Sequence, residues 1–322
     1  MKDRGNDWDE LAINKNRNRR KKSKRGKSKH LAQDEIDARD FVGSLENSSG
    51  KYDWMKEKRY KSIFRDIENK IQGALGKGPF EWVDRRVFDQ VFDRLTLMSL
   101  YKLMKNEVID TVDFPVARGK EAHVFHGTDP QGKSIAIKIF HTSNAVFKNL
   151  MQYIEGDQRF GGLRRRHRDL VDIWVRKEQR NLSRLAKWGL TVPQPLGINK
   201  NVLVMEYLGD DTSPYPKLRE VVVEDPQEVY DELLEFLAVS WQKANLVHGD
   251  FSPFNILWSP NGPVVIDVGQ AVIQSHPKAQ EFLIRDVTRL VEWANKNSIE
   301  VELAEAMYEV LNMDLSHITE VG

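Results

Sequence analysis

One stretch of the chain, residues 247–257, reads Val-His-Gly-Asp-Phe-Ser-Pro-Phe-Asn-Ile-Leu, and a second, residues 264–269, reads Val-Val-Ile-Asp-Val-Gly. Two carboxylates, Asp250 and Asp267, and the carboxamide of Asn255 thus stand beside short apolar segments. Oxygen ligands of this kind suit a divalent cation. Phosphoryl transfer requires such a cation on the phosphates and a carboxylate near the attacking oxygen. The spacing therefore predicts a phosphotransferase site, with Asp250 at the attacking oxygen and with Asn255 and Asp267 on the metal.

Each aspartate has a simpler interpretation when it is taken alone. Asp250 or Asp267 could be an ordinary turn or capping carboxylate, which is a common role for aspartate in loops. The combination with Asn255, and the position of Asp267 at the end of a predicted strand, favours the metal site over that alternative.

A lysine interrupts another apolar segment, residues 135–140, which reads Ile-Ala-Ile-Lys-Ile-Phe. We predict a strand here, and burial of Lys138 in it would be costly without an anionic partner. Glu178, on a predicted helix at 170–188, is the candidate partner, and Lys138 would then contact ATP phosphates as a point charge. The alternative is that Lys138 extends to solvent at a sheet edge while Glu178 makes a surface ion pair.

Two backbone segments are candidates for nucleotide contact. Residues 117–124 include Gly119 and Lys120 and could form a turn over the phosphates. The segment has one glycine rather than three, so a simple turn is the alternative. Further on, a predicted strand at 201–208 could present its last backbone C=O and N–H groups to an adenine ring, near Glu206 and Leu208.

Periodicity predicts the remaining elements. Apolar spacings of three and four indicate helices, and alternation indicates strands. The predicted helices span 84–95 with Asp84 as N-cap, 96–105, 170–188 and 225–244, and a C-terminal helix carries Phe282, Leu283, Val287, Leu290 and Val291 on one face. A hairpin is predicted from the strands at 122–125 and 134–140 with a turn at 129–132, and a long loop spans 141–169.

Composition limits the class of protein. The chain has 322 residues, of which 40% are hydrophobic and 30% charged, as is typical of a globular protein. No apolar run approaches the roughly 20 residues needed to cross a bilayer, and no secretory signal is present. We therefore expect a cytoplasmic protein without a membrane partner. The absence of cysteine excludes disulfides, thiolate metal sites and a cysteine nucleophile.

Charge is distributed unevenly along the chain. The net charge is +1, yet residues 14–30 contain 10 Lys and Arg and no acidic residue. We call residues 1–50 the basic arm and expect it to be mostly disordered. Such an arm suggests a phosphate-bearing partner, nucleic acid above all, because neutralising phosphates releases counterions. The alternative is a solvated tail with no partner.

The order of these motifs resembles the eukaryotic-type protein kinases and is most similar to the RIO family of atypical serine/threonine protein kinases. Within it, the chain looks like the first subfamily in its compact, archaeal-like form. The blocks that carry the resemblance are 118–122, 136–139, 266–270, 84–105 and 282–287. The similarity covers about residues 50 to 310.

The resemblance implies an α+β, two-lobed protein-kinase-like fold with N-terminal helices at 51–112, an N-lobe at 113–209 and a short C-lobe at 210–322. ATP and Mg²⁺, with Mn²⁺ as a second candidate cation, would lie between the lobes. By the same resemblance, Lys138, Glu206 and Leu208 bind nucleotide, as do Gly119 and Lys120 of the phosphate loop. Asp250 is the catalytic acid or base, Asn255 and Asp267 hold the metal, and Asp267 could carry an aspartyl-phosphate.

The resemblance also implies a partner and an acceptor. Family members act in maturation of the small ribosomal subunit, so a precursor particle or its rRNA would bind the basic arm and Arg164–Arg168. The family's self-phosphorylated serine falls in the loop after the lysine strand, where only Thr142 and Ser143 are hydroxyl candidates nearby. The short segment after Asp267 holds no Ala-Pro-Glu motif, which argues against ordinary peptide-substrate recognition.

Three other functions share these residues. Small-molecule phosphotransferases of the aminoglycoside or choline kinase kind also use His-Gly-Asp, Asn five residues later and Asp-x-Gly, although the loop at 119–121 and the short C-lobe favour the RIO interpretation. An ATPase switch in ribosome assembly would use every residue of the kinase. A non-catalytic RNA-binding scaffold is disfavoured because no metal ligand is missing.

Overall fold

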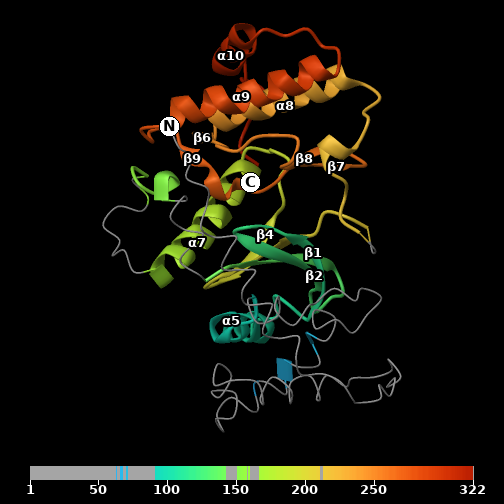
Figure 1. Cartoon of the computed structure of the whole chain (residues 1–322), viewed down its shortest axis with the longest axis vertical. Helices are drawn as coiled ribbons and strands as arrows, with labels where there is room; N and C mark the ends of the chain where they lie inside the picture. The colour runs from blue at the N-terminus through green and yellow to red at the C-terminus, as the bar shows by residue number, and fades with distance from the viewer. Residues whose placement is uncertain are drawn as a thin grey trace, which may run out of the picture. The chain divides into compact units, whose positions relative to one another are not determined.

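The computed structural model describes residues 63, 66, 67, 70, 71, 91–142, 151–157, 159, 167–210 and 213–321 (Figure 1). All of them belong to one compact unit, residues 38–322. The predictions for the basic arm, for the N-cap at Asp84, for Ser143 and for the side chains of Arg164–Arg168 lie outside the described residues. None of the described helices is both long enough and apolar enough to span a bilayer.

A five-stranded antiparallel sheet forms the N-terminal half of the described chain, in the order β1-β2-β3-β5-β4. The predicted hairpin is present and its second strand matches in both bounds. The strands are β1 (Thr111–Arg118), β2 (Ala122–Thr128), β3 (Ser134–Phe140), β4 (Pro195–Asn199) and β5 (Val202–Glu206). β4 was not predicted, because its five residues include Pro195 and Gly197 and show no alternation of burial.

One helix, α5 (Arg94–Lys105), lies against this sheet (Figure 1). Its buried leucines, Leu97, Leu100 and Leu103, join Phe125 of β2 and Ile137 of β3 in a shared core. The helix begins two residues earlier than predicted, because Asp93 caps it by accepting a hydrogen bond from Thr96 N at 2.8 Å. From the sequence, Asp93 was assigned to the interior of the preceding predicted helix, 84–95.

A long helix, α7 (His167–Ala186), follows the loop and leads into the sheet strands β4 and β5. Its prediction at 170–188 is confirmed to within three residues. Gly189 follows its C-terminus with a φ of +75°, the left-handed conformation that glycine adopts readily. One face of α7 is buried, with Trp174 and Glu178 almost completely covered.

Helices dominate the C-terminal half, where α8 (Pro226–Gln242) and α9 (Ala279–Lys296) run side by side and α10 (Leu303–Asn312) packs on both (Figure 1). The predicted apolar face of α9 is buried. Four short strands and one turn of helix lie between α8 and α9. They are β6 (Leu246–Val247), β7 (Ile256–Ser259), β8 (Gly262–Val265), η5 (Val268–Gln270) and β9 (Val272–Ile273). β6 pairs with β9 and β7 pairs with β8, so the two motifs of the opening stretch are brought together.

Candidate active site

Lys138 is the buried centre of the site. It lies mid-strand in β3, paired with Val124 and Leu203 on its two neighbours, and is only 8% exposed. Its Nζ donates to Glu178 Oε1 at 2.6 Å and to Asp267 Oδ1 at 2.8 Å. The predicted ion pair with Glu178 is therefore present, and the alternative of a solvent-exposed lysine is wrong.

Electrostatics keep this lysine charged. Burial alone would lower the pKa of Lys138, but the adjacent carboxylates of Asp267 and Glu178 outweigh it and hold that pKa above its ordinary value. In return, the positive charge of Lys138 lowers the pKa of Asp267. Both groups are ionised at neutral pH, which is the state required for contact with phosphates and with a cation.

Asp267 sits at a special backbone position. It follows β8 directly after Ile266 and adopts a left-handed conformation, with φ 61° and ψ 54°, at the start of η5. Aspartate tolerates this region better than most residues, and such outliers gather at functional sites. The conformation turns the chain at Asp267, whose side chain is 45% exposed and whose Oδ1 faces Lys138.

Asp250 and Asn255 lie in one site, as the sequence predicted, and hydrogen bonds join them. Asn255 Nδ2 donates to the backbone oxygen of Asp250 at 2.9 Å and to its Oδ2 at 3.2 Å. Gln270 Nε2 also lies 3.4 Å from Asp250 Oδ2, a contact that the sequence did not reveal. Asp250 is exposed, yet the protein atoms around its carboxyl raise its pKa, and the negative charge of Asp267 raises it further.

Buried side chains fix the loop that carries Asp250. Asp286 on α9 accepts hydrogen bonds from Gly249 N at 2.7 Å and from Phe251 N at 3.1 Å, on either side of Asp250. Burial raises the pKa of Asp286 to about 7, although these two N–H groups act in the opposite direction. Arg285 Nη2 donates to the Gly249 oxygen. The sequence reasoning gave Asp286 no role.

His248 ties the same loop to the strand that precedes Asp267. Burial lowers its pKa to about 4, so the ring is neutral. Its Nδ1 accepts a hydrogen bond from Asp250 N at 3.2 Å, which places the ring proton on Nε2, 3.2 Å from the Ile266 oxygen. One imidazole ring therefore joins the backbone at Asp250 to the backbone at Ile266, the residue before Asp267.

The predicted turn at Gly119 is present. Gly119 N donates to the Ala122 oxygen at 2.9 Å, and both Gly119 and Lys120 are exposed. Their contact with phosphates stays a prediction. The charges of Asp267 and Lys138 act on the carboxyl group of the neighbouring Glu121. Burial and then the charge of Asp267 raise the pKa of Glu121 to about 7.

In the connector after β5, two backbone groups already make hydrogen bonds within the protein. Glu206 N donates to the Gln194 oxygen at 2.8 Å, and the Leu208 oxygen accepts from Tyr215 N at 3.0 Å. Leu208 N–H makes no hydrogen bond with any residue in the described part of the chain. This N–H is thus available to a ligand, and the role of Glu206 and Leu208 in binding adenine stays a prediction.

The donor set fits magnesium. The amide nitrogen of Asn255 faces Asp250, which leaves its carbonyl oxygen for a cation, and Lys138 occupies Oδ1 of Asp267, which leaves Oδ2. Among the described residues no group of three or more His, Cys, Asp or Glu could hold a metal by itself. Mg²⁺ commonly uses only one or two protein oxygens and takes the rest from phosphates and water, so a two-residue site suits it.

Comparisons with known proteins agree on one family. The model of the RIO domain family matches residues 123–307. A RIO-type serine/threonine-protein kinase Rio1 from Haloferax volcanii is 36% identical over 229 residues, covering 71% of this chain and 78% of that protein. The human serine/threonine-protein kinase RIO1 is 35% identical over 239 residues, covering 73% of this chain but only 42% of the human protein.

A solved structure shares the fold. It is the Rio2 kinase–ADP/Mg²⁺–phosphoaspartate complex from Chaetomium thermophilum, with a TM-score of 0.54 and 22% identity, covering 70% of this chain and 69% of that one. The predicted α+β, two-lobed, kinase-like fold is thereby confirmed. The chain belongs to the RIO kinase family and is of the Rio1 type.

Proposed function

We propose that this chain transfers the γ-phosphate of ATP to a serine or threonine hydroxyl, with Mg²⁺ as cofactor and Mn²⁺ as its possible replacement in vitro. The observation that carries the proposal is the double contact of Lys138 with Glu178 and Asp267. This contact supports the proposal because a protein kinase requires a lysine paired with a helix glutamate, beside an aspartate that can hold the metal.

Each residue has a separate task in this reaction. Lys138 orients the phosphates, and Asn255 and Asp267 hold Mg²⁺, which neutralises the charge of the phosphates when it is bound. The acceptor oxygen bonds to the γ-phosphorus as the bond to the bridging oxygen breaks and ADP leaves. The hydroxyl proton passes to the carboxylate of Asp250, whose raised pKa suits a general base.

ATP hydrolysis is the second candidate, and it shares this site. The 45% exposed carboxylate of Asp267, fixed at Oδ1 by Lys138, could itself accept the phosphoryl group. Water would then cleave the acyl phosphate, release inorganic phosphate and restore Asp267. The small-molecule phosphotransferase alternative loses its support with the assignment to the RIO family.

The test is to incubate the purified chain with γ-labelled ATP, Mg²⁺ and casein, and to follow label in protein and in free phosphate. Acid-stable label on serine or threonine supports the kinase, whereas label in free phosphate with a hydroxylamine-labile adduct supports the ATPase. Asp250→Asn should lower transfer by about 10²–10⁴-fold, and exposed Asp231→Asn on α8 should not. A wild-type chain that releases no phosphate and labels no acceptor contradicts both.

For the biological role we propose maturation of the small ribosomal subunit. The support is the family resemblance together with the 10 positive charges at 14–30. Removing residues 1–30 should weaken binding to small-subunit rRNA and flatten its dependence on salt, because fewer counterions are released. ATP binding should be unaffected. Unchanged rRNA affinity and salt dependence would refute the role of the basic arm.

A further inference from the structure

A fully buried lysine lies behind the Asp267 turn and takes no part in the chemistry described above. Lys177 on α7 is 0% exposed, and its Nζ donates to the backbone oxygens of Gly269 at 2.7 Å and of Ala271 at 2.6 Å. The same nitrogen lies 5.0 Å from the centre of the Trp174 ring. Both carbonyls belong to the turn that follows Asp267, so Lys177 bonds that turn to α7.

Asn181 holds the same turn one helical turn further along α7. Its Nδ2 donates to the Val268 oxygen at 2.9 Å and to the Ala271 oxygen at 3.0 Å. Its Oδ1 accepts from Arg159 Nη1 at 2.9 Å. Two side chains of one helix thus satisfy three of the four carbonyls between residues 268 and 271.

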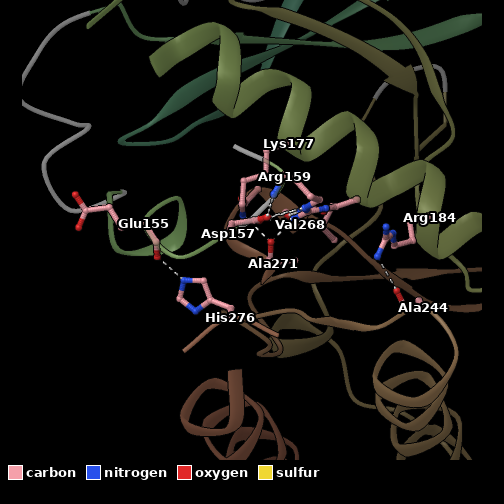
Figure 2. A network of polar contacts seen from close by, with 11 residues as sticks. Glu155, Asp157, Arg159, Lys177, Arg184, Ala244, Val268, Ala271 and His276 are labelled. Carbon is pink, nitrogen blue, oxygen red and sulfur yellow. Dashed lines mark hydrogen bonds and ion pairs between the residues drawn. The ribbon is translucent and has the colours of Figure 1, made fainter. Parts of the chain in front are cut away.

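An ion pair within the segment between β3 and α7 supports this arrangement. Arg159 Nη2 lies 2.7 Å from Asp157 Oδ2, and Arg159 Nε lies 3.0 Å from Asp157 Oδ1. Figure 2 shows Lys177, Arg159 and Asp157 gathered beside Val268 and Ala271. The turn after Asp267 is therefore held by side chains and not by packing alone.

Burying the polar side chain of Lys177 costs free energy that an apolar side chain at the same position would not cost. Burial, with a further contribution from Arg159, lowers the pKa of Lys177 to about 7. A methionine of similar length would fill this space without that cost. A role in the site explains why a lysine is present here. The next residue on α7, Glu178, accepts a hydrogen bond from Lys138, and Lys138 also donates to Asp267.

We propose that Lys177 and Asn181 are positioning residues, which hold the Val268–Ala271 turn and thereby keep Asp267 directed at Lys138 and at the bound metal. Neither residue touches the reacting atoms. One helix then positions both halves of the site, with Glu178 acting on the lysine and Lys177 and Asn181 acting on the metal ligand. The part of this inference that concerns the metal rests on the proposed function.

Two variants separate this role from a merely structural one. Lys177→Met removes both hydrogen bonds from Nζ to the turn and keeps the length of the side chain. Asn181→Asp replaces the two donors with an acceptor and keeps a partner for Arg159, so the outer ion pair stays in place. Arg180→Met is the matched control, because it removes an exposed positive charge from the same helix.

Hydrogen–deuterium exchange of the free protein is the first readout. The peptide covering residues 268–273 should exchange about tenfold faster in both variants, since each loses bonds worth roughly one factor of ten, whereas peptides of β3 should not change. The second readout is phosphotransfer against Mg²⁺ concentration. Half-saturation should require about tenfold more Mg²⁺ and kcat should fall, while KM for ATP at saturating Mg²⁺ changes little.

Outcomes of the two readouts can be told apart. Unchanged exchange at 268–273 and unchanged Mg²⁺ dependence in folded variants would overturn the positioning role. If Lys177→Met fails to fold, Asn181→Asp decides the question, since it retains the buried lysine. A wild-type chain without phosphotransfer would remove the proposed function, and the exchange experiment would still show whether Lys177 and Asn181 hold the turn.

Discussion

Replacing Gly269 with alanine should damage the site by a purely steric route. A Cβ at this position would lie 3.1 Å from Glu178 Oε2, 3.1 Å from Trp174 Nε1 and 3.4 Å from Trp174 Cε2. Neither neighbour can move easily, because Trp174 is 0% and Glu178 is 1% exposed and Lys138 holds Glu178. Overpacking of this kind costs about 1–3 kcal/mol. The turn should therefore shift away from α7 and take Asp267 with it.

A double-mutant cycle with Trp174→Phe tests this reasoning. Trp174 Nε1 has no hydrogen-bond partner among the described residues, so phenylalanine loses packing but no hydrogen bond while it opens space beside Gly269. The urea midpoint of Gly269→Ala should fall by roughly 0.5–1 M, and kcat should fall with it. In the double variant the two losses should combine to about 1 kcal/mol less than their sum. Losses that add to within about 0.5 kcal/mol would refute the steric explanation.

Two further changes act on other carboxyl groups, Asp286 and Glu121. Asp286→Ala leaves the buried N–H groups of Gly249 and Phe251 without their acceptor, so the free energy of unfolding in urea should fall by about 2–5 kcal/mol. Asp286→Asn keeps one acceptor oxygen and should lose less. Equal losses in the two variants would contradict this explanation. Glu121→Gln removes a carboxyl whose pKa is raised from 4.5 to about 7 on folding, so ionisation destabilises the native state increasingly from pH 4.5 to 7. Partial exposure limits the effect, so the variant should be more stable than wild type above pH 7 by at most about 2 kcal/mol and equal to it below pH 4.5, as thermal unfolding across pH will show.

The elements best predicted from sequence are those with continuous periodicity. β3 was predicted to the residue, because a strand that is apolar except for Lys138 is a strong local signal, and α8 was predicted to within two residues. β4 could not be predicted in this way. It is short, it contains proline and glycine, and only its pairing with β5 makes it a strand. Tertiary contact decided its structure, and local preference did not.

The site shows the same division. Lys138 was found because a charge inside an apolar strand needs a partner. Asp286 carries an equivalent signal, since it stands four residues after Phe282 and four before Leu290 on the apolar face of α9. Lys177 is harder to find, because its bonds go to backbone carbonyls far along the chain, and no residue type at those positions reveals them.

The carboxyl groups around Lys138 should also affect how a cation and a nucleotide bind together. This one ammonium group is in contact with two carboxylates, Glu178 and Asp267, and the carboxyls of Glu121 and Asp250 feel the charge of Asp267 as well. In the reaction that we propose, these carboxyls would repel the phosphates of a nucleotide that arrives without a metal ion. We therefore expect the cation and the nucleotide to raise each other's affinity for the protein.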